Sequence, residues 1–291
     1  MTKPEGSYAS VDVHTAYDLE QALDFRAQYP EARVLAGGTD LMVEMDLGHI
    51  PQSVLNIWPI GELRGIRERP DGLWIGALTT HRELVESLLA EAWAPALIES
   101  CRTVGAVQIQ NRGTLGGNIA NASPAGDTLP VLLALDADVE VASAARGVRS
   151  VPMEYLYRGY RAMNIEPDEL IIGVRLPEPH SADQTHYRKV GTRLAQAISK
   201  VVFGGRVRIV DGVVVESRVA FGSVAATPIR CRGVEEALLG RAVDPQVARL
   251  VADDIAPIDD IRSTSGYRGR VAENILRSWL TSLLPAQEED V

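Results

Sequence analysis

The apolar and polar positions of the first sixty residues follow two different periods. Short alternating runs at 8–13 (YASVDV) and 32–38 (ARVLAGG) are typical of half-buried β-strands. Between them the apolar residues recur at helical spacing, and Thr15 and Asp18 have the spacing of a capping box at the helix start. These elements predict a compact α+β unit over residues 1–58.

A second α+β unit is predicted over residues 59–178. Thr80 and Glu83 have the spacing of a capping box ahead of one amphipathic helix at 81–92. Apolar runs bounded by turn residues predict strands at 63–70, 73–78, a pair within 136–153 and one more at 168–179, after a strand at 53–57 that ends the first unit. Helices are predicted at 95–104 and 127–135.

The segment 177–181 is predicted to link this unit to a separate C-terminal domain over residues 182–286, because its two prolines interrupt helix and sheet alike. Beyond it, two β-branched runs joined at Asp211 and Gly212 predict a β-hairpin. Helical patterns follow at 233–240, 244–255 and 267–284. The C-terminal domain is therefore expected to be an antiparallel sheet of three strands with helices on one side, and the whole chain to be α+β.

The charge, hydropathy and cysteine content of the chain exclude several classes of protein and site. A chain of 291 residues with a formal charge of -10 and a pI near 5.1 lacks the basic patch that binding to nucleic acid or to an anionic membrane needs. It contains neither a run of about 18 apolar residues nor a signal-peptide core at its start, so no membrane span and a cytoplasmic location are expected. Cys101 and Cys231 cannot supply a four-cysteine iron–sulfur centre, and no histidine spacing indicates a metal site.

Two glycine-rich stretches carry the candidate chemistry, 34–40 (VLAGGTD) and 111–127 (NRGTLGGNIANASPAGD). Without a Cβ, glycine lets backbone N–H groups approach a ligand closely, and Thr39, Thr114 and Ser123 add hydroxyls, so a phosphate-bearing ligand is indicated. Neither stretch is a Walker or a Rossmann motif. On the residues alone, a structural turn or bulge remains an equal alternative.

The two stretches, with their order and flanking segments, resemble those of a known family, the FAD-binding medium subunits of molybdenum hydroxylases. Carbon monoxide dehydrogenase and the multi-subunit bacterial xanthine and aldehyde dehydrogenases are members. The resemblance spans nearly the whole chain and rests on LAGGTDLM (35–42), NRGTLGGNIANASPAGD (111–127), DELIIGVRLP (168–177), YRKVGTRLAQAISKV (187–201), AFGSVAATPIR (220–230) and EEALLG (235–240). The sequence departs from the family pattern at Gln110, where arginine is usual, and at Gln196 and Ala197, where an aspartate often occurs.

The resemblance implies the FAD-binding fold of the vanillyl-alcohol oxidase or PCMH type, with FAD between subdomains 1–58 and 59–178. The residues that it assigns to FAD in the first loop are Val34, Leu35, Ala36, Gly37, Gly38, Thr39 and Asp40. Those that it assigns in the second region are Gly105, Thr114, Gly117, Asn118, Ala120, Asn121 and Ser123. No catalytic side chain and no metal ligand are implied.

Four further residues are assigned by the resemblance, each beside a plainer alternative. Asp127 is expected to accept hydrogen bonds from ribose or ribityl hydroxyls, the alternative being an N-cap of the following helix. Leu170 and Ile171 are expected to pack on the isoalloxazine ring, or else to be simple strand core. Lys189 is expected near the ring, where a cation favours the reduced flavin, the alternative being a solvated strand lysine.

The implied function is that of an electron-transfer flavoprotein subunit. It would accept electrons from [2Fe-2S] clusters on a small partner subunit, beside a large molybdopterin subunit, in a dimer of heterotrimers. A stand-alone FAD-dependent oxidase or dehydrogenase is the alternative enzyme, and a non-catalytic module the alternative of another class. Replacement of Gly37 or Gly117 with a β-branched residue is expected to abolish flavin retention, because added bulk would fill the space of the phosphates.

Overall fold

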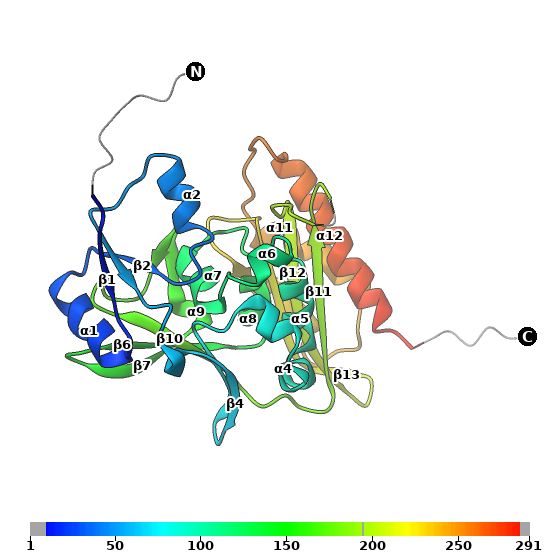
Figure 1. Ribbon diagram of the computed structural model, residues 1–291. Helices are drawn as coiled ribbons and strands as arrows, with labels where there is room; N and C mark the ends of the chain where they lie inside the picture. The colour runs from blue at the N-terminus through cyan, green and yellow to red at the C-terminus, as the bar shows by residue number, and fades with distance from the viewer. Residues whose placement is uncertain (1–9, 194, 286–291) are drawn as a thin grey trace, which may run out of the picture.

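The computed structural model describes residues 10–193 and 195–285. Three sheet-and-helix units follow one another along the chain and lie side by side, the first at the left and the last at the right of Figure 1. Their sheets use strands from residues 12–56, 66–176 and 183–230. No helix of the described residues is long and apolar enough to cross a membrane.

The first unit is a small parallel sheet with two helices. Its elements are β1 (Asp12–Thr15), α1 (Leu19–Gln28), β2 (Arg33–Leu35), α2 (Leu41–Asp46) and β3 (Ser53–Asn56). β3 lies between β1 and β2 and runs parallel to both. The predicted capping box is wrong, because Thr15 ends β1 and the side chain of Asp18 caps α1 by accepting a 2.8 Å hydrogen bond from the Gln21 N–H.

The second unit is built on a five-stranded antiparallel sheet. Its strands, in spatial order, are β4 (Ile66–Arg69), β5 (Gly72–Gly76), β10 (Leu170–Leu176), β6 (Asp138–Ser143) and β7 (Gly147–Pro152). β10 is central, because it pairs with both β5 and β6. The last strand of the unit along the chain thus lies in the middle of the sheet.

Short helices connect β5 to β6. They are α3 (His81–Val85), α4 (Leu88–Trp93), α5 (Pro95–Arg102), α6 (Val107–Gln110), α7 (Leu115–Asn121) and α8 (Leu129–Ala134). The single helix predicted over 81–92 is wrong, because Ser87 caps a new helix through a hydrogen bond from the Ala90 N–H. The capping box of Thr80 and Glu83 is confirmed.

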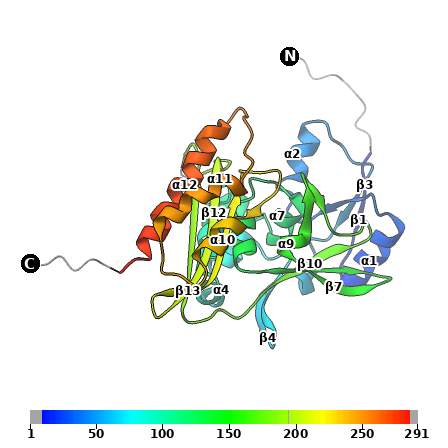
Figure 2. The ribbon, with the colours of Figure 1, turned by 180° about the vertical axis from the view of Figure 1, so that it is seen from behind.

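The C-terminal domain is an antiparallel sheet covered by helices on its outer face (Figure 2). The elements are β11 (Asp183–Val190), β12 (Val201–Val210), β13 (Val213–Gly222), β14 (Ile229–Arg230), α10 (Arg232–Leu238), α11 (Val251–Asp254) and α12 (Ser265–Ser282). The predicted hairpin is confirmed, but the sheet has four strands and not three, because the short β14 pairs with β13 at Phe221 and Ala220. Two residues are too few for an apolar alternation to reveal.

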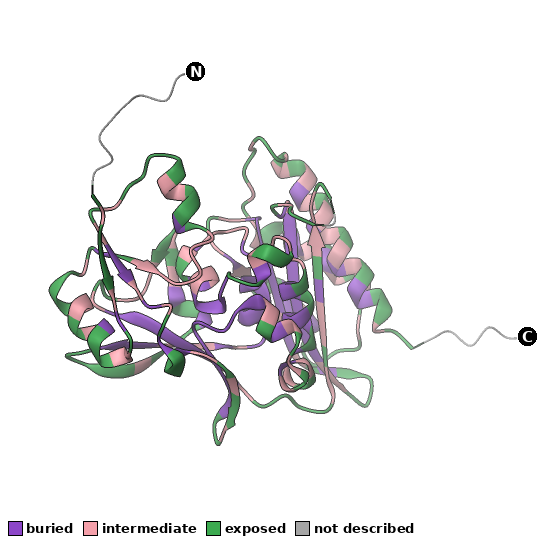
Figure 3. Ribbon diagram, in the orientation of Figure 1, coloured by how far each residue is buried: buried purple, intermediate pink, exposed green. Residues whose placement is uncertain are grey.

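The inner face of this sheet packs on the second unit, so the two domains share buried surface. Figure 3 shows buried residues gathered in β12, β13 and the neighbouring α8. A Cβ at Gly204 of β12 would lie 2.7 Å from the Pro130 carbonyl oxygen of α8. Asp136, just after α8, accepts hydrogen bonds from Arg206, Arg218 and Arg230 of the sheet. The C-terminal sheet therefore has a fixed place against the helices that carry the second glycine-rich stretch.

Candidate cofactor-binding site

A cavity of 1660 Å³ lies where the three units meet. It exceeds the roughly 300–1,000 Å³ of most small-molecule pockets, so a large ligand fits. All of the residues predicted for the site line it except Leu35 and Lys189, namely Val34, Ala36, Gly37, Gly38, Thr39, Asp40, Gly105, Thr114, Gly117, Asn118, Ala120, Asn121, Ser123, Asp127, Leu170 and Ile171.

The first glycine-rich loop connects β2 to α2 and presents free backbone donors. Gly38 has a φ of +80°, a left-handed conformation that favours glycine. Among the described residues, the backbone N–H groups of residues 37–40 find no hydrogen-bond acceptor. Unpaired N–H groups beside a large cavity are suited to the oxygens of an anionic ligand.

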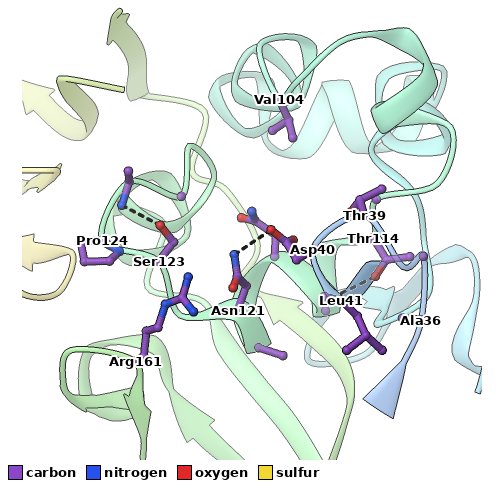
Figure 4. A pocket seen from close by; sticks show the side chains of 18 of the residues that line it. Ala36, Thr39, Asp40, Leu41, Val104, Thr114, Asn121, Ser123, Pro124 and Arg161 are labelled. Carbon is purple, nitrogen blue, oxygen red and sulfur yellow. Dashed lines mark hydrogen bonds between the residues drawn. The ribbon is translucent and has the colours of Figure 1, made fainter. Parts of the chain in front are cut away.

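The two glycine-rich stretches touch each other at this cavity. A Cβ built on Gly37 would lie 1.8 Å from the Arg112 carbonyl oxygen, and the amide of Asn121 donates a 3.2 Å hydrogen bond to Asp40 (Figure 4). The sequence-based reason for Gly37 was therefore wrong. Its missing side chain makes room for the opposite loop, and this close approach brings the two walls together.

The middle of the second stretch is helical, because α7 covers Leu115–Asn121, although the stretch was predicted as a loop. The Thr114 hydroxyl oxygen caps α7 by accepting a 3.0 Å hydrogen bond from the Gly117 N–H. Gly116 packs closely against Ala77, which follows β5 of the same unit. A Cβ built on Gly116 would lie 2.6 Å from the Cβ of Ala77. A Cβ at Gly117 would meet only the Thr114 hydroxyl, at 2.8 Å, and both glycines of this pair line the cavity.

Asp127 is held by a buried ion pair at the cavity wall. Its carboxylate accepts a 2.6 Å hydrogen bond from Lys189 Nζ and a short one from the Ser199 hydroxyl. Burial raises the pKa of the Asp127 carboxyl, and the Lys189 ammonium opposes that rise. The N-cap alternative is wrong, since Thr128 occupies the cap position of α8 and the cap has no side-chain hydrogen bond.

The side chain of Lys189 is only 8% exposed, so the alternative of a solvated strand lysine is wrong as well. Besides the ion pair it donates a 2.9 Å hydrogen bond to the Thr103 carbonyl oxygen. It does not line the cavity itself, and it reaches the lining only through its ion pair with Asp127. Leu35 also lies outside the lining, and its side chain packs against Gly38.

Leu170 and Ile171 begin the central strand β10 and are 3% and 9% exposed. Both are therefore core residues of the strand, and both line the cavity as well. The pairing of β10 with β6 shifts by one residue directly after Ile171. Such a bulge redirects the strand at the cavity edge.

The departures from the family pattern lie beside the cavity. Gln110 donates hydrogen bonds to the carbonyl oxygens of Arg102 and Val104, which ties the end of α5 to the loop at Gly105. The Gln196 N–H donates to the Gly105 carbonyl oxygen across the domain boundary. Gln110, from within the second unit, and Gln196, from the C-terminal domain, therefore both hold the segment at Val104 and Gly105, which lines the cavity.

Several lining residues carried no signal in the sequence. The C-terminal domain contributes a mixed apolar and polar wall, and α3 contributes His81. They come from segments far from either glycine-rich motif, so only the fold brings them to the cavity. The residues of this group are His81, Arg161, Ile198, Ala225, Ala226, Ile258, Arg262 and Arg268.

His81 makes the stability of the protein sensitive to acid. Burial lowers the pKa of its imidazole from 6.5 to about 4, so between these values the unfolded chain binds a proton that the folded chain does not. Stability is therefore lost as the pH falls from 7 to 5, by about 2 kcal/mol from this residue. Urea unfolding of the FAD-free protein and of His81→Leu at both pH values measures this. The variant should lack that share of the loss, and an equal loss in both proteins would contradict the assignment.

Comparison with known proteins decides the family. Residues 9–179 match the model of the FAD binding domain in molybdopterin dehydrogenase. The chain belongs to this family. Residues 185–283 match the CO dehydrogenase flavoprotein C-terminal domain, so the family relationship extends through both domains. The resemblance read from the glycine-rich motifs is confirmed.

This flavoprotein is similar to named subunits over most of its length. It is 30% identical over 280 residues to a putative xanthine dehydrogenase FAD-binding subunit of Escherichia coli (strain K12), which covers 94% of this chain and 96% of the relative. It is 31% identical over 277 residues to the carbon monoxide dehydrogenase medium chain of Afipia carboxidovorans, with 92% and 94% covered. A solved carbon monoxide dehydrogenase from Hydrogenophaga pseudoflava superimposes with a TM-score of 0.88 at 28% identity, covering 92% of this chain and 95% of that one.

The chain is thus an FAD-binding subunit of the molybdenum hydroxylase family and part of an oxidoreductase. Two of its relatives are named medium chains, which indicates a complex of several subunits. Both cysteines, Cys101 and Cys231, are free and buried, and the described residues contain no cluster of histidine, cysteine and acidic side chains that could hold a metal ion.

Proposed function

We propose that FAD lies in the 1660 Å³ cavity with its diphosphate between the two glycine-rich stretches. One observation carries this proposal: residues 37–40, whose backbone N–H groups have no acceptor among the described residues, line the same cavity as Thr114 and Gly117, and the close approach at Gly37 brings the two stretches together. Backbone donors and hydroxyls bind phosphate oxygens without a basic patch. The arrangement also supports the PCMH-type organisation, with FAD between subdomains 1–58 and 59–178 and the domain 182–286 closing the third side.

The remaining residues would orient the cofactor. Asp127 has its carboxylate fixed by Lys189 and Ser199 and would accept a ribose or ribityl hydroxyl. Leu170 and Ile171 would offer an apolar surface to the isoalloxazine ring. Lys189 would act on the ring through Asp127, because it does not line the cavity itself. The bound flavin supplies the redox chemistry, and these residues position it.

The subunit would pass electrons from [2Fe-2S] clusters of a small partner subunit to an external acceptor. A large molybdopterin subunit would oxidise the substrate, and the assembly would be a dimer of heterotrimers. The relatives that are named as medium chains or FAD-binding subunits support this reading over a stand-alone oxidase.

Purification of the native complex through a tag on this chain tests the function. We expect a yellow preparation with about one FAD per chain, two further polypeptides, and stoichiometric iron and molybdenum. A yellow chain that purifies alone, without iron or molybdenum, would instead be a stand-alone flavoenzyme. A colourless protein that binds no added FAD would refute flavin binding itself.

A further inference from the structure

His81 opens α3 at the place where the second glycine-rich stretch meets the sheet. Its N–H donates a 3.0 Å hydrogen bond to the Gly113 carbonyl oxygen, and the preceding Thr80 forms a bridge with Thr114. The capping box of Thr80 and Glu83 fixes the start of this helix. The backbone of His81 is therefore rigidly placed beside the cavity wall.

The imidazole has no hydrogen-bond partner within the described residues, although the side chain is only 1% exposed. Nδ1 is completely buried and unpaired. Nε2 also lacks a partner but is not sealed from the cavity, whose lining includes His81. Since a neutral imidazole carries one proton, the proton belongs on Nε2, the nitrogen that can reach an acceptor.

Hydrogen-bond donors lie beside this edge of the ring. The Ile109 carbonyl oxygen, 3.0 Å from a Cβ built on Gly113, is also near, but it already accepts hydrogen bonds from the backbone N–H groups of Arg112 and Gly113. A Cβ built on Gly113 would lie 3.3 Å from His81 Cδ2, the carbon bonded to Nε2, and 3.5 Å from the Thr39 hydroxyl oxygen. The imidazole and the Thr39 hydroxyl thus converge above Gly113, next to the free N–H groups of residues 37–40. The nearby Asp40 carboxylate already accepts a hydrogen bond from Asn121. A cluster of donors of this kind recognises a ligand rich in acceptor oxygens.

We infer that His81 is a further cofactor-binding residue, whose Nε2–H donates a hydrogen bond to an oxygen of the FAD diphosphate. The inference rests on the proposed site of the diphosphate. Burial keeps the imidazole uncharged at neutral pH, since it lowers the pKa to about 4. The residue would therefore add a directed donor without adding a positive charge.

Two substitutions separate the hydrogen bond from packing. His81→Gln keeps an N–H donor near the position of Nε2, and His81→Leu removes it. FAD affinity of the full chain, measured by quenching of flavin fluorescence, should fall about tenfold or more in His81→Leu, because hydrogen bonds to charged groups contribute roughly 1.5–3 kcal/mol. His81→Gln should recover most of that loss. Riboflavin, which lacks the diphosphate, should bind both variants as it binds the wild type.

Nuclear magnetic resonance gives a second readout on the wild-type chain itself. The ¹⁵N signals of His81, assigned by their loss in His81→Gln, should report a neutral Nε2–H tautomer and should shift when FAD binds. Unchanged signals, or equal FAD affinity in the wild type and His81→Leu, would overturn the inference while leaving flavin binding intact. Equal losses in the Leu and Gln variants would also overturn it and assign His81 to packing. Failure of the wild type to bind FAD would instead refute the proposed function.

Discussion

Gly37→Ala should reduce FAD affinity by about a hundredfold or more, although it adds one methyl group. The new Cβ would lie 1.8 Å from the Arg112 carbonyl oxygen and 2.6 Å from its carbonyl carbon. Backbone atoms cannot turn away as a flexible side chain can, so the first loop must move off the second. The site needs both walls at once, and a displacement of 1 Å in a binding site is costly. Titration with FAD, followed by flavin fluorescence, measures the loss.

Gly61→Ala is the matched control, because a Cβ at Gly61 meets nothing within 4 Å and its φ is not left-handed. It should bind FAD like the wild type. Gly117→Ala should have a smaller effect than Gly37→Ala, since the new carbon meets only the Thr114 hydroxyl. For Gly37, the contact with Arg112 replaces the expectation that added bulk fills the space of the phosphates, whereas for Gly117 that expectation stays a prediction. Equal affinity in Gly37→Ala and Gly61→Ala would show that the two stretches do not have to touch.

Lys189→Met should lower the free energy of unfolding by about 3–5 kcal/mol, because it leaves the Asp127 carboxylate buried without its cation. The Ser199 hydroxyl alone cannot offset that loss. Burial raises the pKa of Asp127, and removal of the ammonium raises it further, so the folded variant binds a proton more readily than the unfolded chain. The deficit should therefore shrink as the pH falls from 7 toward 5. Urea unfolding at both pH values measures it.

Lys200→Met is a suitable control for the loss of a lysine nearby in the chain. Lys200 Nζ lies 5.3 Å from the centre of the Tyr267 ring, and no carboxylate among the described residues pairs with it. It should cost less than about 1 kcal/mol. The double variant Lys189→Met with Asp127→Asn should recover part of the deficit, because the amide removes the buried charge. No gain in the double variant would indicate that the lysine stabilises the fold mainly through Thr103.

The sequence was informative where a local pattern decides the structure. The hairpin at Asp211 and Gly212 and the capping box at Thr80 depend on neighbouring residues, and both are present. The apolar spacing predicts one helix over 81–92, but the structure has two. Ser87 caps the second helix, and the spacing of apolar residues does not reveal this break. The helix α7 was missed because glycine-rich sequence favours a loop until packing against Ala77 fixes it.

The candidate site shows the same division between local and distant effects. The glycine-rich pattern indicated Thr39 and Thr114, and the family resemblance assigned most of the other predicted residues that line the cavity, including Asn121. The reason for Gly37 could not be read, because the partner atom belongs to Arg112, 75 residues away. His81 has no glycine or charge pattern around it, and its burial and missing partner appear only in the folded chain.

The central claim is that two stretches distant in the sequence hold one diphosphate. Hydrogen exchange with and without FAD tests this claim most directly. The backbone N–H groups of residues 37–40 have no acceptor among the described residues and should exchange rapidly in the FAD-free chain. Addition of FAD should protect residues 37–40 and 113–121 together, while the outer helix α12 is unchanged. Protection of only one of the two stretches, or of neither at saturating FAD, would contradict the account.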